Sequence, residues 1–225
     1  MPVDAIINVN GDSVQALDIT LLLVVITLLP TLVVMMTSFT KYAISFSFLR
    51  TAMGTQQTPP NMVLVGMALI LTLFTMTPTM NDIKTNAYDP YVNGAIGQEE
   101  FFDRAQIPLK RFMLRNAEIS SVELFCTMAG ETPPATVEEL EQAVDLPITV
   151  VTAAFVTSEL KAAFWIGFLV YIPFMLIDVI VSSTLMSMGM IMLPPSMIST
   201  PFKILLFIML DGWQLLFSTL IQTVK

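Results

Sequence analysis

Four methionines recur at every second position near the end of a long apolar stretch. They are Met186, Met188, Met190 and Met192, and Pro194–Pro195 follow. Methionine is unbranched, polarisable and deformable, so it suits surfaces that must adapt to many shapes. A spacing of two places alternate side chains on one face of an extended segment. The pattern predicts a flexible apolar seal on a non-helical segment, with a methionine-rich packing turn as the alternative.

Ionisable residues inside apolar stretches form the second group of side chains that could take part in chemistry. Asp178 lies within one such stretch and Lys203 lies near the start of the next. Charges in such stretches are costly, and they indicate pairing or function. We expect a short connection to bring Asp178 and Lys203 together as an ion pair, with Glu159 competing for the lysine. The alternative is a lysine that snorkels to the interface and an aspartate that faces a wet cavity.

Charged residues within apolar stretches are also compatible with two other classes of protein. A small-solute or ion transporter would place Asp178 and Lys203 on its pathway. A membrane-embedded peptidase would use Asp178 and Asp211 as paired carboxylates, although neither acid lies in a motif expected of such enzymes. The sequence has no histidine and one cysteine, Cys126, which excludes histidine-based acid–base catalysis, His or multi-Cys metal sites and an intrachain disulfide. We therefore expect no enzymatic activity and no cofactor.

The composition is that of a membrane protein. Of the 225 residues, 55% are hydrophobic and only 12% are charged, about half the charge of a soluble domain. Four apolar stretches each approach or exceed the roughly 20 residues that cross a bilayer as a helix; they are 19–37, 62–80, 162–186 and 202–224. Amphipathic extensions at 40–51 and 150–161 favour protein neighbours over lipid. The sequence predicts two hydrophobic helical hairpins, 19–80 and 147–225.

A polar insert at 81–146 separates the hairpins. Between Asp82 and Asp145 there are twelve acids and five bases, which carry nearly all of the net charge of −8 and argue against nucleic acid as a partner. We expect helices at 99–113 and 118–128 and a capping box at Thr136–Glu139.

The distribution of bases predicts a topology. The connection 38–61 carries Lys41 and Arg50 and no acid, so it is expected on the cytoplasmic side, with the acidic insert outside and the Met-rich loop 186–197 on the cytoplasmic side. The polar N-terminal segment 1–18 lacks the pattern of a signal peptide. We expect that such a peptide has been removed.

Four long, spaced blocks carry a resemblance that covers the chain from about residue 20 to 220. They are Thr37–Lys41 with Leu49–Asn61; Pro108–Arg115; Phe155–Lys161 with Ile172–Phe174 and Ile177–Asp178; and Met186–Pro195 with Pro201–Lys203 and Asp211–Leu215. In these blocks the chain resembles the FliP/SctR family, the export-gate subunits of type III secretion systems. The motif Gly54, Gln56, Gln57, Pro59 and Pro60 is more similar to flagellar members than to virulence members.

The resemblance implies an all-α fold, in which hairpins of hydrophobic helices pack into an oligomeric cone and the polar insert is small and helical. It implies a homopentamer joined by the small helical proteins FliQ and FliR around an export channel. The assembly would lie largely on the periplasmic side of the bacterial inner membrane, within the flagellar basal body. It would contact lipids and other export-apparatus membrane proteins and pass unfolded flagellar substrate proteins. Apolar stretches that look transmembrane would then be mostly buried against neighbouring subunits.

The resemblance also assigns site residues. Its pore gasket falls on Met190, Ile191 and Met192, with Met186 and Met188 adding to the apolar ring. The family pattern has three consecutive methionines, so Ile191 is a departure, and a β-branched side chain is stiffer. The family's charged positions fall on Glu159, Asp178 and Lys203, where interhelix or intersubunit pairing is implied.

The leading hypothesis is a core subunit of the flagellar type III export gate that forms a channel for unfolded flagellar proteins across the inner membrane. The alternatives are the virulence (injectisome) counterpart of the same gate and a small-solute or ion transporter.

Overall fold

The fold is helical, as the sequence predicts. The computed structural model describes residues 6–9, 12–55, 57–190 and 192–225, so the predicted site residues Gln56 and Ile191 lie outside the described residues. The helices are α1 (Ala16–Met35), α2 (Phe39–Ala52), α3 (Asn61–Ile83), α4 (Asp89–Val92), α5 (Gln98–Asn116), α6 (Ile119–Ala129), α7 (Val137–Gln142), α8 (Ile148–Ser187), α9 (Pro195–Met209) and α10 (Gly212–Gln222), with a π-helical turn η1 (Lys84–Tyr88) after α3.

A short antiparallel hairpin of β1 (Ile6–Val9) and β2 (Asp12–Gln15) precedes α1, with Ile6 opposite Gln15. The first helix then begins at Ala16.

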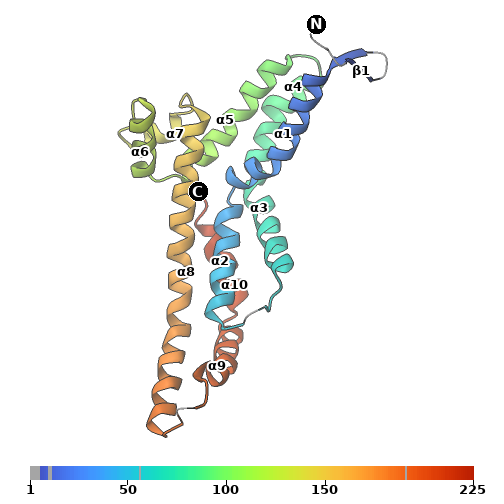
Figure 1. The fold of residues 1–225 in the computed structure, drawn as a ribbon. Coiled ribbons are helices and arrows are strands. Elements are labelled where there is room, and N and C mark those ends of the chain that lie inside the picture. Colours follow the sequence, from blue (N-terminus) through green and yellow to red (C-terminus); the bar gives the residue numbers. More distant parts are fainter. Residues whose placement is uncertain (1–5, 10–11, 56, 191) are drawn as a thin grey trace.

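The 40-residue helix α8 is the axis of the molecule. At 1.5 Å per residue it is about 60 Å long. Figure 1 shows α5, α6 and α7 gathered around its beginning, α2 and α10 beside its middle, and α9 near its end. The third apolar stretch and its amphipathic extension therefore form one continuous helix, which runs through Pro173 without a break in the helical assignment.

Two helical segments are long and apolar enough to cross a membrane, namely Asn61–Val92 and Ile148–Ser187. Two bent pairs qualify if each counts as one span. The segment Ile26–Met35 meets α2 at 68°, and α9 meets α10 at 64°. By length and composition, the described residues therefore contain two candidate spans, or up to four if each bent pair is one span.

The fourth apolar stretch predicted at 202–224 does not form one straight helix, because the chain bends by 64° between α9 and α10. Asp211 adopts a left-handed backbone (φ 49°) and Gly212 follows it. A Cβ at position 212 would lie 2.2 Å from Phe207 Cδ2, so only glycine admits this ring so close to the backbone. Hydropathy cannot report the bend, because both sides of it are apolar.

Two hydrophobic cores share α8. In the first, Tyr42, Phe46 and Leu49 form a buried stripe on α2 that packs with Ile166 of α8. Their spacing of four and three residues is that of one helical face. The second core joins the insert to the start of α8. Because one helix passes through both cores, the insert and the hairpins form one packed unit.

The capping box predicted at the start of α7 is present with a small difference. The Glu139 amide donates to Thr136 Oγ1 at 3.2 Å, and the Glu139 carboxylate accepts from the amide of Ala135 at 2.8 Å. The reciprocal bond therefore reaches one residue further back than the standard pattern.

The free thiol of Cys126 should be inert in the folded protein. Cys126 lies in α6 with no exposed surface, and burial, followed by the nearby Glu131 carboxylate, raises the pKa of the thiol. Since the thiolate is the nucleophile, we expect slow alkylation by maleimide at pH 7.5 and fast alkylation after denaturation. Equal rates in the native and denatured protein would contradict this burial.

Candidate functional site

The methionine-rich segment is a helix end and a turn. Met186 belongs to the last turn of α8, Met188 is its C-cap, and Gly189 adopts a left-handed backbone (φ +74°). The Gly189 amide donates to the Met186 carbonyl at 3.1 Å, and the Met190 amide donates to the Leu185 carbonyl at 3.0 Å. This pair of bonds is a Schellman motif, which satisfies the last carbonyls of a helix and favours glycine. The extended segment predicted from the spacing is therefore wrong.

The turn exposes its methionines at one end of the molecule. Met192 is 99% exposed, and Met186, Met188 and Met190 are exposed by 43 to 70%. Pro195 then opens α9, a position that proline favours because its missing N–H needs no partner there. We call the described residues 186–190 and 192–195 the methionine tip.

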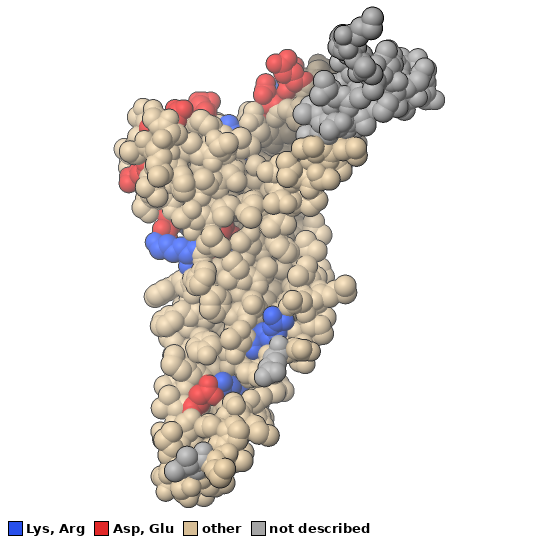
Figure 2. Space-filling view, in the orientation of Figure 1, with Lys and Arg blue, Asp and Glu red and all other residues tan. Residues whose placement is uncertain are grey.

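The tip and the acidic insert occupy opposite ends of the chain. Figure 1 places the α8–α9 turn far from α6 and α7, and Figure 2 shows the acidic side chains gathered mainly at the insert end. No charged residue occurs between Asp178 and Lys203 in the sequence. The tip is therefore an uncharged, apolar and exposed surface.

Asp178 and Lys203 meet behind the tip. Lys203 Nζ lies 2.6 Å from Asp178 Oδ2 and donates a second bond, at 3.1 Å, to the backbone carbonyl of Ala52. Ser199 Oγ donates to the other Asp178 oxygen at 2.7 Å. The lysine side chain is 6% exposed and the aspartate side chain 38% exposed. The pair thus joins α8, α9 and the end of α2 at one point.

The predicted motif at 54–60 lies in the connection between α2 and α3, which follows the Ala52 carbonyl that Lys203 binds. Gly54 adopts a left-handed backbone (φ +74°), and a Cβ there would lie 3.2 Å from Thr200 Oγ1 and 3.8 Å from Lys203 Nζ. The connection therefore packs against α9. Gln57 is exposed, Pro59 is partly buried and Pro60 is the N-cap of α3.

Glu159 does not compete for Lys203, which corrects the expectation from the sequence. It pairs with Lys41 of α2, with Nζ and Oε1 2.9 Å apart and the two side chains only 1% and 2% exposed. The sequence analysis did not identify Lys41 as a partner. The signal was available, because Lys41 and Glu159 lie in the two amphipathic extensions, and these extensions pack as α2 against α8.

Several polar atoms around this pair have no hydrogen-bond partner. They are Glu159 Oε2, Tyr42 Oη, Ser38 Oγ and Ser45 Oγ, all buried. Unpaired buried polar groups cost free energy. The pair therefore lies in a polar pocket of an otherwise apolar helix bundle.

The described residues contain no group of three or more His, Cys, Asp or Glu side chains able to hold a metal ion. Asp178 is engaged with Lys203 and Ser199, whereas Asp211 occupies the bend before α10. The Asp178 carboxylate is therefore held by an ion pair and a hydrogen bond, whereas Asp211 lies at the N-cap of α10.

Comparisons with known proteins agree on one family. The profile described as the FliP family matches residues 22–220. The chain is 45% identical over 203 residues to the flagellar biosynthetic protein FliP of Bacillus subtilis, covering 90% of this chain and 89% of that protein. It is 42% identical over 214 residues to the protein of the same name from Aquifex aeolicus, covering 95% and 88%. For the one from Pectobacterium carotovorum the identity is 46% over 211 residues, covering 94% and 78%.

Proposed function

Because this chain belongs to the FliP family and is a component of the flagellar type III export gate, we propose that copies of it form the channel that passes unfolded flagellar proteins across the inner membrane. The observation that carries the proposal is the methionine tip. It is apolar, exposed and free of charge, and it follows the longest helix in the described part of the chain.

An exposed apolar tip can close a pore when several copies converge. A ring of apolar side chains dewets a narrow constriction and thereby blocks ions. Methionine is flexible enough to repack around a chain of varying side chains. The tip would therefore seal the resting channel and deform around an extended polypeptide. In this arrangement Met190 and Met192 form the narrowest part, and Met186 and Met188 line its entrance.

One chain supplies only part of such a ring, so we propose a homopentamer completed by FliQ and FliR. Large apolar side chains remain exposed along α3 and α8, which supports further helical neighbours or lipid on these faces; they include Met62, Ile70, Phe164, Trp165 and Phe168. We place the assembly largely on the periplasmic side of the membrane, with the insert outermost. Native mass spectrometry of the detergent-extracted gate tests the stoichiometry, and a monomer without partners would exclude the ring.

Replacing Met190 and Met192 by alanine should make the resting channel leak ions. The Schellman bonds are made by the backbone, so the turn should persist while the seal loses apolar volume. We expect membrane conductance in reconstituted bilayers to rise several-fold. The matched control is Met197→Ala, which removes an exposed methionine (69%) from α9 outside the tip. Unchanged conductance in the double variant would exclude this role for the tip.

A further inference from the structure

The methionine tip holds four thioether sulfurs in one short turn, and all four belong to exposed side chains. Methionine sulfur is readily oxidised to the sulfoxide. An exposed sulfur meets a dissolved oxidant without any opening of the fold. The tip is therefore open to this chemistry in the folded protein, at Met186, Met188, Met190 and Met192.

Buried methionines of the same chain are protected. Met113 has no exposed surface, and its sulfur accepts a hydrogen bond from Thr152 Oγ1 at 3.7 Å. Met76 is only 1% exposed. An oxidant reaches either sulfur only when the surrounding helices open, and such openings cost free energy. We therefore expect the tip to be oxidised well before these two residues.

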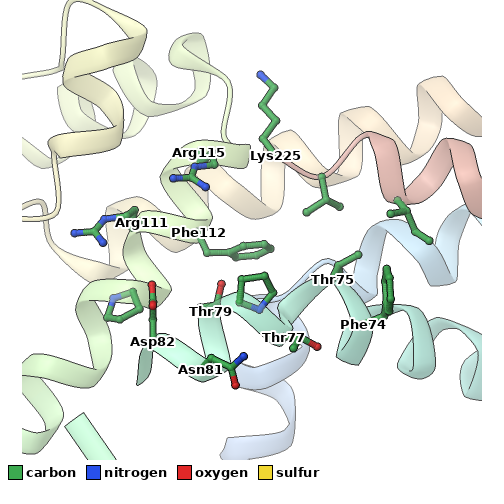
Figure 3. A pocket seen from close by; sticks show the side chains of 14 residues that line it. Phe74, Thr75, Thr77, Thr79, Asn81, Asp82, Arg111, Phe112, Arg115 and Lys225 are labelled. Atoms are coloured by element: carbon green, nitrogen blue, oxygen red, sulfur yellow. The ribbon is translucent and has the colours of Figure 1, made fainter. Parts of the chain in front are cut away.

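The cavity of about 720 Å³ where α3, α5 and the C-terminal segment meet presents no thioether to a small oxidant. Figure 3 shows threonine hydroxyls, aromatic rings and charged side chains in its lining, and the described lining contains no methionine. Thr75 and Thr77 of α3 line the cavity, whereas Met76 between them does not. Entry of an oxidant here therefore leaves the buried sulfurs untouched.

We propose that the tip methionines are sites of reversible oxidation to methionine sulfoxide, and that this modification opens the seal. The oxidant is a peroxide. The sulfur lone pair attacks one oxygen of hydrogen peroxide, an S–O bond forms and the O–O bond breaks. The second oxygen leaves as hydroxide and becomes water when it takes the proton from the transferred oxygen. Each sulfur is oxidised by two electrons while the peroxide is reduced, and methionine sulfoxide reductases reverse the change.

The effect on the seal follows from polarity and rests on the proposed function of the tip. A sulfoxide is polar, whereas the thioether is apolar. The sequence has no charged residue between Asp178 and Lys203, so the tip repels water through its apolar side chains alone. A constriction that is closed by dewetting fills with water when its wall becomes polar. In the proposed ring the tip faces the channel, where dissolved peroxide reaches it.

Peroxide treatment of the reconstituted gate tests the inference, with peptide mass and membrane conductance as separate readouts. Each sulfoxide adds one oxygen atom to the mass of its peptide. We expect the tip methionines to gain oxygen before Met113 and Met76, and conductance to rise several-fold over the same preparation before treatment. Methionine sulfoxide reductases of both stereospecificities should then lower the conductance again.

Leucine variants separate the tip from other exposed sulfurs, because leucine has a similar apolar volume but no sulfur. Each variant is compared with itself before and after peroxide, so the resting conductances need not match. A variant with leucine at all four tip positions should not respond. The matched control is Met197→Leu, which removes an exposed sulfur from α9 outside the tip and should respond like the unmodified protein. Exposed Met62 and Met128 remain in both variants, so their oxidation cannot explain a difference.

Three outcomes would overturn the inference. Tip methionines that gain oxygen no faster than Met113 and Met76 would remove the modification site. A four-leucine variant that still leaks after peroxide would place the sensitive residue elsewhere. An oxidised tip with unchanged conductance would show that the seal tolerates the sulfoxide. In this last case the alanine variant of Met190 and Met192 distinguishes the two proposals, because it still leaks if the tip is the seal and does not leak if the proposed function also fails.

Discussion

Replacing Lys41 by alanine is expected to lower the free energy of unfolding by about 3–5 kcal/mol, since the substitution leaves a buried carboxylate without its counter-ion. Lys41 and Glu159 are almost fully buried and 2.9 Å apart. Glu159 Oε2 has no hydrogen-bond partner among the described residues, so the carboxylate depends on Lys41 for its compensation. The measurement is thermal unfolding in detergent, followed by the fluorescence of Trp165 and Trp213.

The double variant Lys41→Met with Glu159→Leu separates charge from packing. A buried ion pair replaced by apolar side chains of similar volume is often neutral or stabilising, so the double variant should recover much of the loss. Lys161→Ala is the matched control, because its pair with Glu118 is exposed (68% and 43%) and is expected to contribute less than about 1 kcal/mol. A Lys41→Ala protein as stable as the Lys161→Ala protein would show that Glu159 finds water or another partner.

Replacing Lys203 by alanine should destabilise the chain by about 2 kcal/mol and disturb the methionine tip. The stability loss is smaller than for Lys41, because the Asp178 side chain is 38% exposed and water can hydrate part of the freed charge. The tip is disturbed for a geometric reason. Lys203 also holds the Ala52 carbonyl, so its loss frees α8, α9 and the α2–α3 connection from their common contact. We expect a lower yield of assembled gate and weaker export of flagellar proteins.

The comparison of Lys203→Arg with Lys203→Met tests this account. Arginine keeps a charge for Asp178, whereas methionine keeps only the apolar stem. Thermal unfolding and native mass spectrometry on both variants, with Asp178→Asn as the reciprocal change, report stability and assembly separately. Normal assembly and full export in Lys203→Met would mean that the ion pair is dispensable and that the tip does not depend on this contact.

The length and composition of apolar stretches determine much of this fold before any tertiary contact is considered. A stretch of about 20 uncharged residues cannot leave its backbone groups unpaired in an apolar environment, so helices follow. The helix α3 and the second half of α8 could be predicted for this reason, whereas α5 and α6 followed from helical apolar spacing and the capping box of α7 from its sequence motif. The proximity of Asp178 and Lys203 could also be anticipated, because only a short connection separates their helices.

Other features depended on tertiary packing. The partner of Glu159 is Lys41, which is 118 residues away in the sequence, so only the packing of α2 against α8 identifies it. The bend at Asp211 was not predictable from hydropathy, because the residues on both sides of it are apolar; it depends on the Phe207 ring lying against Gly212. The cavity between α3 and α5 likewise joins residues from three segments.

The methionine tip shows most clearly which properties come from the sequence and which come from the tertiary structure. The sequence by itself determined the chemistry of the segment: four soft side chains, a glycine, two prolines and no charge. Its conformation was decided by the structure, because the α8 hydrogen-bond ladder continues through Met186 and closes on Gly189 in place of an extended strand. Residue types set what a surface can touch and deform around. The direction in which it points follows from backbone bonds and from contacts with helices that are distant in the sequence, and these are properties of the folded chain.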